Sequence, residues 1–260
     1  MCPMNPRLLR PLSGFSPRQF AGLQLWLDGS NQSTVTLNGT TVSEWRSKVG
    51  GIALTQGTAA AQPTLTANYV NGRSALTFDG GDFLYAASAA LAIAPSTSFL
   101  VIDETTAVNF SGLLVGTPAS GSDFSSTGGF VTTGRDTGNA VGNTILRGSN
   151  VGAAVSAELV ANSLSLGASA YGRRLVSVLV TESTASLRVG GVQGQNDSAH
   201  TVSGSSTGTL VGGRFLSGAV SASFRFNGRI CEILHYSRSF SLAETQAMER
   251  WLAQRWGVTL

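Results

Sequence analysis

Residues 224–258 read FRFNGRICEILHYSRSFSLAETQAMERWLAQRWGV, and this stretch decides the fold. It begins with an expected strand over residues 229–236 that is apolar on both faces. Period-2 alternation divides its side chains into one set with Ile230, Glu232, Leu234 and Tyr236 and another with Cys231, Ile233 and His235. A strand of this kind is typical of a position between two layers rather than at a wet surface.

A helix is expected immediately after this strand. Ser241 and Glu244 form an S-x-x-E capping box, which predicts where the helix begins, and Gly257 is expected to end it. Apolar residues recur between these ends at helical spacing, namely Leu242, Met248, Trp251, Leu252 and Trp256. We therefore expect one amphipathic helix to close one side of an otherwise all-β body.

The chain before this stretch is expected to form short strands separated by turns. Strands are predicted over residues 22–28, 42–46, 75–78, 98–103, 112–116, 175–181 and 185–189. The apolar run 98–103 is expected in the centre of a sheet, with 112–116 pairing near it. The last two strands flank a short turn and form the clearest hairpin, whereas residues 29–36 and 53–62 are expected as surface loops.

Several of these stretches resemble concanavalin A-like, laminin G-like jelly rolls, which occur in bacterial secreted proteins and in phage virion proteins. The C-terminal stretch carries the resemblance through G-x-I-x-E, Y-x-R and the closing W-x-x-x-x-W-G. Residues 71–84 (NGRSALTFDGGDFL) are similar to the family's N-G-x-P-A segment, with Ser74 where proline is usual. Other segments resemble the family in the same order along the chain. Residues 23–28 and 42–46 resemble its opening pair of strands, residues 175–191 its central hairpin, and residues 208–214 its late strand. The resemblance implies a two-sheet antiparallel jelly-roll sandwich with one C-terminal α-helix.

Residues 1–22 are expected as an extended N-terminal arm ahead of a single domain over residues 23–260. Four of the seven prolines lie in this arm, so it can form neither a long helix nor a central strand. It is either a disordered leader or an arm that docks on a neighbouring subunit. We favour docking, with partner contacts from Arg7, Leu8, Leu9, Arg10, Phe15 and Phe20.

Charge and cysteine content exclude several classes of function. Charged residues make up 12% of the chain, and its 17 basic residues are scattered, so no basic stripe predicts a nucleic-acid partner. No apolar run is long enough to predict a membrane span, and no signal peptide is expected. The two cysteines, Cys2 and Cys231, do not form a disulfide framework, and Cys231 is interpreted as a buried apolar filler.

Few residue patterns in this sequence are typical of catalytic sites. Glycanases of this fold need two facing carboxyl groups, but no expected strand carries two acids on one face. We interpret Glu232 as a structural carboxylate near the helix, and Asp79 and Asp82 as turn residues. Cys231 and His235 share a face but lie roughly 13 Å apart at strand spacing, which excludes a dyad. We expect no enzyme activity.

Ligand sites are predicted only loosely. No cofactor is expected, although the resemblance leaves open a Ca²⁺ ion bound by the loop residues Asp123, Asp136, Asn139, Asn143, Asn196 and Asp197. The four tryptophans are expected in the core. Possible glycan contacts are the loop aromatics Tyr69, Phe124, Phe130 and Tyr171.

These observations favour a non-enzymatic structural protein of a phage virion. It would be a capsid decoration, fibre or tail appendage subunit, made in the host cytoplasm, and homo-oligomeric. Its arm would bind other virion proteins. The alternative is a glycan-binding, lectin-like adhesion module, and a glycanase is the least favoured hypothesis.

Overall fold

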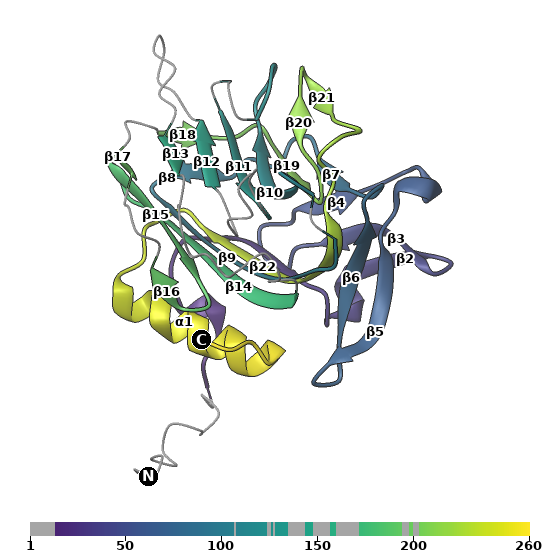
Figure 1. The fold of residues 1–260 in the computed structure, drawn as a ribbon, viewed down its shortest axis with the longest axis horizontal. Coiled ribbons are helices and arrows are strands. Elements are labelled where there is room, and N and C mark those ends of the chain that lie inside the picture. The colour runs from purple at the N-terminus through teal and green to yellow at the C-terminus, as the bar shows by residue number, and fades with distance from the viewer. Residues whose placement is uncertain are drawn as a thin grey trace.

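A computed structural model of the chain describes residues 14–106, 108–123, 126, 128–134, 144–147, 157–159, 172–193, 198–199 and 203–260. These residues form an antiparallel β-sandwich of two layers, with one α-helix on the outer side of one layer (Figure 1). The predicted all-β jelly-roll architecture with a C-terminal helix is therefore confirmed.

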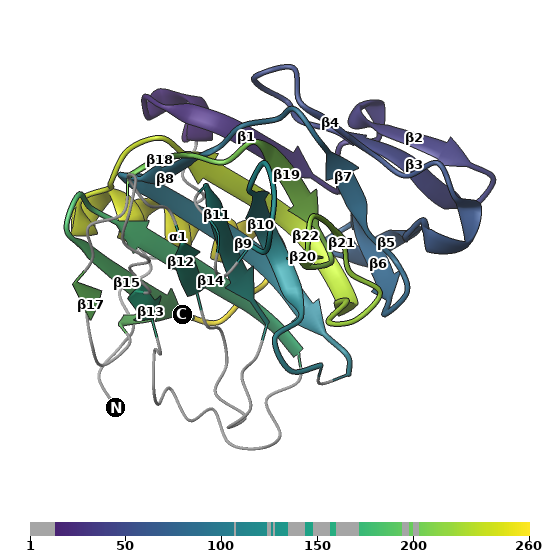
Figure 2. The same ribbon diagram turned by 90° about the horizontal axis from the view of Figure 1, so that it is seen from above.

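The first layer is built around the C-terminal strand β22. Its main strands are β1 (Leu23–Asp28), β6 (Arg73–Asp79), β9 (Ser96–Glu104), β14 (Gly172–Val180), β15 (Thr184–Val189) and β22 (Asn227–Tyr236). Strand β22 pairs with β9 along one edge and with β1 and β6 along the other. Figure 2 shows β1, β22, β9 and β14 side by side in this order. The predicted central strand and the predicted hairpin are both confirmed.

The second layer contains β2 (Val35–Asn38), β3 (Thr41–Arg46), β4 (Ala53–Thr55), β7 (Leu84–Ala86), β10 (Gly112–Thr117), β11 (Gly129–Thr133), β12 (Thr144–Arg147), β13 (Ala157–Leu159) and β19 (Gly208–Val211). The hairpin of β5 (Thr64–Val70) and β6 turns at Asn71–Gly72 and joins the two layers. Shorter strands are β8 (Ala92–Ala94), β16 (Val192–Gln193), β17 (Ser198–Ala199), β18 (Gly204–Ser205), β20 (Phe215–Leu216) and β21 (Ala219–Val220), and short 3₁₀ turns are Pro17–Gln19, Gln32–Thr34 and Ala59–Ala61.

Two expectations about this layer are wrong. Strand β10 pairs with β11 and β19 in the second layer, not near β9. Strand β2 begins inside the expected loop 29–36, and strand β4 lies inside the expected loop 53–62. Strand β4 has three residues and only one buried side chain, Leu54, so it is too short to show alternation in the sequence.

Two large apolar clusters pack against the two faces of the first layer. Between the layers lie residues such as Leu25, Leu27, Leu100, Ile102, Val176 and Ile233. Beneath the helix lie Trp26, Phe99, Cys231, Leu234, Tyr236, Met248, Leu252 and Trp256. Strand β22 is apolar on both faces because both faces are covered, as predicted.

A bulge in β22 changes which side chains share a face. The pairing of β22 with β9 shifts register between Ile230 and Glu232. Cys231 and Glu232 therefore both lie on the helix side, whereas Ile230 and His235 lie between the layers. The predicted alternation is wrong at this point, and Cys231 and His235 are on opposite faces. The Cys231 thiol is free and buried, and burial raises its pKa.

Helix α1 (Leu242–Trp256) begins and ends where the sequence predicts. Ser241 and Glu244 form a reciprocal capping box, and Gly257 ends the helix with a φ of 59°. Met248, Leu252 and Trp256 are buried against the first layer, but Leu242 is 57% exposed, so its assignment to the apolar stripe is wrong. No helix in the described part of the chain is long and apolar enough to cross a membrane.

The described part of the N-terminal arm lies on its own domain. The Phe15 ring packs 5.7 Å from that of Trp251, and the Phe20 ring lies 4.9 Å from that of Phe240. These two side chains therefore anchor the end of the arm on its own domain, and the prediction that they also contact a neighbouring subunit stays a prediction. The other predicted arm contacts, Arg7, Leu8, Leu9 and Arg10, lie outside the described residues.

Candidate functional site

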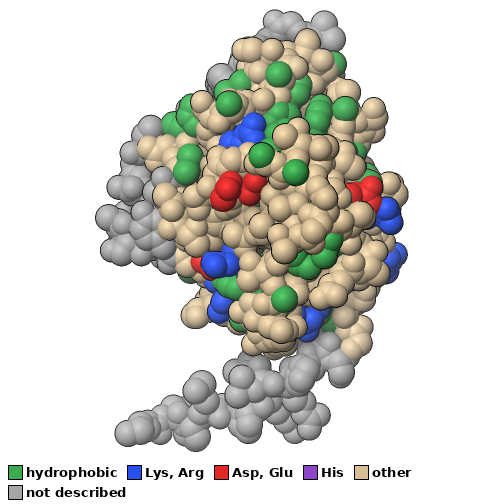
Figure 3. Space-filling view, turned by 90° about the vertical axis from the view of Figure 1, so that its right-hand side faces the viewer, with side chains coloured by type: hydrophobic (Ala, Val, Ile, Leu, Met, Phe, Trp, Pro, Cys, Tyr) green, Lys and Arg blue, Asp and Glu red, His purple; other side chains and the backbone are tan. Residues whose placement is uncertain are grey.

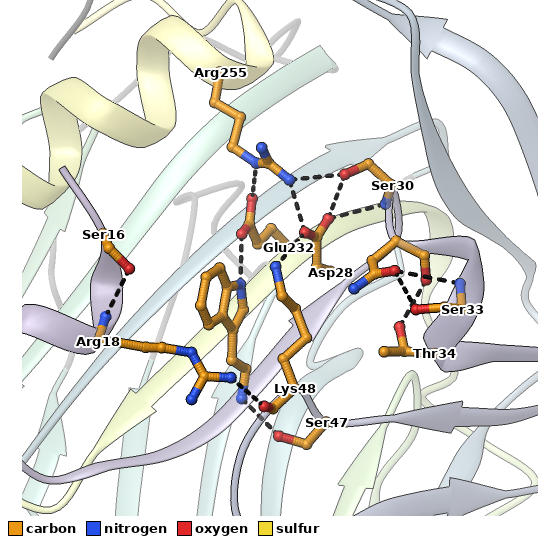
Figure 4. Close-up of polar contacts among 12 residues, drawn as sticks. Ser16, Arg18, Asp28, Ser30, Ser33, Thr34, Ser47, Lys48, Glu232 and Arg255 are labelled. Atoms are coloured by element: carbon orange, nitrogen blue, oxygen red, sulfur yellow. Dashed lines mark hydrogen bonds and ion pairs between the residues drawn. The ribbon is translucent and has the colours of Figure 1, made fainter. Parts of the chain in front are cut away.

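Two carboxyl groups face each other where β1 pairs with β22. Asp28 and Glu232 are register partners, and Arg255 of the helix binds both of them. Its Nη2 lies 2.7 Å from Asp28 Oδ2, and its Nε lies 2.8 Å from Glu232 Oε2 (Figure 4). The sequence did not predict this pair because its members lie on strands from opposite ends of the chain.

This pair is enclosed by the protein and does not face a substrate. Glu232 is 0% exposed and Asp28 is 1% exposed. The indole N–H groups of Trp26 and Trp256 donate to Glu232 at 2.7 and 2.5 Å. Lys48 Nζ lies 3.1 Å from Asp28. The predicted position of Glu232, hydrogen-bonded near the helix, is confirmed, and its contacts join the helix to the sheet.

The two carboxyl groups differ in their electrostatics. Burial raises the pKa of Glu232, and the negative charge of Asp28 raises it further. Arg255 acts to lower this pKa but does not outweigh the other two effects. Burial also acts to raise the pKa of Asp28, but Arg255, Ser30 and Lys48 outweigh it and hold that pKa below its usual range. Split pKa values of this kind occur in acid–base pairs, yet here they follow from enclosure in an ion network.

Tyr69, a predicted glycan contact, lies in a polar cleft at the end of the helix. Its hydroxyl donates to the Asp103 carboxylate, and Asp103 pairs with Arg229 at 3.2 Å. The guanidinium carbons of Arg229 and Arg173 lie 4.9 and 5.9 Å from the centre of the Tyr69 ring. Because arginines already contact this ring, Tyr69 is a poor platform for a sugar. Burial and the neighbouring Asp103 raise its pKa to about 12.

Of the other predicted glycan contacts, the structure describes only Phe130. Phe130 is 3% exposed and stacks on His235 between the layers, so the expectation of a rim aromatic is wrong for this residue. Phe124 and Tyr171 lie outside the described residues. Trp26, Trp45 and Trp256 are buried, as expected for core residues.

A hollow of about 600 Å³ lies at the edge of β4 and β7, and we call it the Tyr85 hollow. It is lined by residues 50–53, 55–57, 83 and 85–89, and every one of these is uncharged. Tyr85 is placed by pairing with Leu210 on one side and Thr55 on the other. The Phe215 ring lies 6.0 Å away, so Tyr85 is supported from the adjacent apolar cluster.

Gln56 lines this hollow and carries a buried amide donor with no partner among the described residues. The residue is 8% exposed, and its Oε1 accepts from the Thr58 backbone N–H at 2.9 Å. This contact fixes the orientation of the amide, because a flipped amide would set two donors against each other. Its Nε2 has no hydrogen-bond partner among the described residues. An unpaired buried donor costs free energy, which an acceptor on a ligand would recover once the Gln56 amide turns toward the hollow.

The wall of the Tyr85 hollow is largely backbone. Gly50 has a φ of +69°, and a Cβ there would lie 2.7 Å from the Gln24 carbonyl oxygen, so only glycine lets this loop pass so close to β1. Nothing lies within 4 Å of the positions where Gly51 and Gly57 would carry a Cβ. The only hint in the sequence is the pattern of residues 83–89, FLYAASA, in which alternating aromatics precede small residues.

Candidate metal ligands are not brought together in the described part of the chain. No group of three or more His, Cys, Asp or Glu side chains there could hold a metal ion. Asp123 is buried and binds Arg214 through both oxygens at 2.7 and 2.8 Å, so it is not a loop ligand. Asp79 and Asp82 bond to backbone N–H groups of their own turn, as predicted. The remaining predicted Ca²⁺ ligands, Asp136, Asn139, Asn143, Asn196 and Asp197, lie outside the described residues.

Basic side chains of the described residues lie in small separate groups on the face drawn in Figure 3, with no continuous stripe. A nucleic-acid surface presents clustered Lys and Arg side chains, and the described residues on this face do not form such a cluster.

No protein-family model and no curated protein matches the sequence. Solved structures match it in fold. Domain 4 of AbnA, a GH43 extracellular arabinanase from Geobacillus stearothermophilus, was solved in complex with arabinotriose. It superposes with a TM-score of 0.58 and 10% identity, over 88% of this chain and 98% of that one.

Two further structures are similar over part of their length. The binding domain of Paraclostridial Mosquitocidal Protein 1 gives a TM-score of 0.52 at 10% identity, over 88% of this chain and 52% of that one. A GH54 α-L-arabinofuranosidase soaked with a cyclic sulfate inhibitor gives 0.53 at 13% identity, over 92% and 60%. At these identities the similarity shows the fold, a sandwich like those of carbohydrate-binding domains. None of the three is a virion protein, so the similarity supports the sandwich and not the predicted link to phage.

Proposed function

We propose that this chain is a glycan-binding module that holds a neutral oligosaccharide in the Tyr85 hollow. One observation carries the proposal: the half-buried Tyr85 ring lines an uncharged hollow whose lining also includes Gln56, a residue with an unpaired amide donor. A sugar ring presents C–H groups on its faces and hydroxyl oxygens around its edge. An aromatic face and a fixed N–H donor match these two surfaces.

The size and charge of the hollow fit this ligand class. Its volume of about 600 Å³ lies within the range of small-molecule sites. Because its lining is uncharged, it offers no ion pair to a charged sugar, and neutral pentoses or hexoses are the better match. An open site with two aromatic rings, Phe83 and Tyr85, and few polar groups should bind a trisaccharide with a Kd of about 0.1–1 mM.

The structural neighbours support binding over catalysis. The arabinanase domain was solved with arabinotriose bound, and the mosquitocidal protein segment is a binding domain. Asp28 and Glu232 are enclosed by the helix, so we infer that this carboxylate pair takes no part in hydrolysis. The alternative hypothesis of a lectin-like module is thus better supported than the virion hypothesis.

The test is a titration of arabinotriose and other neutral trisaccharides, followed by NMR or calorimetry. Tyr85→Leu keeps an apolar side chain against Phe215 but removes the aromatic face, and Gln56→Met removes the amide donor. Each variant should weaken binding about tenfold. Tyr69→Phe, which alters the separate cleft, is the matched control and should bind normally. The proposal is overturned if no neutral oligosaccharide binds, or if Tyr85→Leu binds as well as the wild type.

A role in a phage virion stays a second proposal, resting on the sequence alone. Sugar binding and attachment to a particle are compatible, because surface subunits can adhere to glycans. Residues 15–20 pack on their own domain, so the deletion that tests docking should remove only residues 1–13. Loss of incorporation into particles with an unchanged melting temperature is expected, and normal incorporation of the truncated chain would contradict docking.

A further inference from the structure

A second depression, separate from the Tyr85 hollow, lies between the helix and the β15–β16 hairpin. It consists of two hollows of about 650 and 270 Å³. Both are lined by Gly190, Val192 and Leu260, so they adjoin and form one groove. From this groove we infer a second binding site, for an acidic polysaccharide whose carboxylates bind Arg173 and Arg250.

Positive charge predominates along the groove. Its lining contains four arginines and two acidic residues: Arg173, Arg174, Arg188, Arg250, Asp103 and Glu249. Both acidic residues are already paired within the protein. Arg188 Nε lies 2.8 Å from Glu249, and Asp103 is paired with Arg229. Arg174 is likewise paired, with Glu104 at 2.9 Å.

Arg173 and Arg250 are left without a carboxylate partner in the described part of the chain. Arg173 lines the first hollow and Arg250 lines the second, so the two cations mark separate parts of the groove. Arginine is well suited to bind carboxylates through two parallel hydrogen bonds. A ligand with carboxylates at repeated intervals would match both positions.

Arg173 also has a structural role that any test must separate from binding. Its Nη2 donates to the Gly257 carbonyl at 2.9 Å and so caps the end of the helix. Its Nε is buried and has no acceptor among the described residues, so only its terminal nitrogens could reach a ligand. Arg250 is exposed and has no such second role, so its substitution isolates the effect of charge.

The centre of the groove suits the carbon skeleton of a sugar chain. Val192 is 51% exposed and Leu260 is 47% exposed, so both present apolar surface to a ligand. Gly190, with a φ of 56°, contributes only backbone to the lining. A polyuronate combines apolar C–H faces with one carboxylate on each sugar. The inference rests on the proposed function only in taking a polysaccharide as the ligand class.

The experiment titrates an oligogalacturonate against the full chain, with the same oligomer in methyl-esterified form as the uncharged comparison. The acidic oligomer should bind, and its affinity should fall several-fold when salt is raised from about 0.1 M to about 1 M, because screening shortens the reach of charges. Arg250→Gln and Arg173→Gln should each weaken binding about tenfold. Arg46→Gln, which removes an exposed arginine on β3, is the matched control and should bind normally.

The outcomes separate this site from the Tyr85 hollow. Tyr85→Leu should lose neutral sugars but keep the oligogalacturonate, so failure of one site leaves the other testable. Equal binding of the methyl ester, or unchanged affinity in Arg250→Gln, would overturn the inference. So would an Arg173→Gln variant with a lower melting temperature but full affinity, since that arginine would then act only as a helix cap. Tighter binding of poly-glutamate than of the oligogalacturonate would overturn the choice of a sugar ligand.

Discussion

Replacing Glu232 with glutamine tests whether the buried carboxylate fastens the helix to the sheet. Three N–H donors converge on its two oxygens, from Trp26 at 2.7 Å, Trp256 at 2.5 Å and Arg255 at 2.8 Å. Glutamine has nearly the same volume but only one acceptor oxygen, and its NH₂ group is a donor. The substitution therefore sets at least one donor against another without leaving a cavity.

The expected cost follows from these contacts. Removing one partner of a buried ion pair typically costs about 3–5 kcal/mol. Arg255 keeps its contact with Asp28 in this variant, so we expect the lower end, about 3 kcal/mol. At roughly 2–4 °C for each kcal/mol, the melting temperature should fall by about 10 °C.

The measurement is urea unfolding together with a thermal melt of Glu232→Gln and the wild type. Arg46→Gln is the control, because it breaks only the exposed Arg46–Glu44 pair and should cost less than about 0.5 kcal/mol. If Glu232→Gln unfolds within about 0.5 kcal/mol of the wild type, the converging contacts do not stabilise the fold and the reasoning is refuted.

Three further changes test other contacts of the fold. Burial lowers the pKa of His235 to about 4, whereas the unfolded chain takes up this proton below about pH 6.5. The free energy of unfolding should therefore fall by about 3 kcal/mol as the pH drops from 6.5 to 4, and urea titrations of His235→Gln should lose most of that slope. Glu249→Ala leaves the buried Arg188 without its ion-pair partner and should lower the free energy of unfolding by about 3–5 kcal/mol, as measured by thermal melts. A double variant that also changes Arg188 to Leu should recover most of this loss, and a double variant that recovers none of it would contradict this account. Gly257→Ala places a side chain at a φ of 59° and should cost about 1 kcal/mol by urea unfolding, and an unchanged midpoint would argue against the helix cap.

Features encoded by neighbouring residues could be predicted from the sequence. The capping box of Ser241 and Glu244 and the Gly257 stop depend only on contacts within one turn of helix, and both lie where expected. The Asn71–Gly72 turn and the hairpin of β14 and β15 are equally local. Local signals of this kind are enough to predict the helix, this turn and this hairpin.

Features that depend on register between distant strands could not be predicted. Asp28 meets Glu232 only because β1 pairs with β22 in one alignment, and the bulge after Ile230 decides on which face Cys231 lies. Neither the β1–β22 register nor the position of the bulge can be predicted from the spacing of apolar residues.

The Tyr85 hollow could not be predicted from the sequence for a related reason. The Tyr85 hollow is made by two segments, 50–57 and 83–89, that meet only when β4 pairs with β7. The sequence favours Tyr69 as a loop aromatic. Its contacts with Asp103 and Arg229 depend on how the strands β5, β9 and β22 come together. An aromatic residue in a sequence does not reveal which of its faces the folded chain has already covered.

The position of β22 in the first layer has a consequence for how the protein is made. This strand pairs with β1, β6 and β9, yet it follows all of them in the chain. A nascent chain emerging from the ribosome therefore lacks the strand that joins its earlier ones until residues 227–236 have been made. Long-range pairing of this kind folds slowly, so this layer is expected to assemble only after β22 has emerged, and the edges of β1 and β9 that β22 covers stay exposed until then.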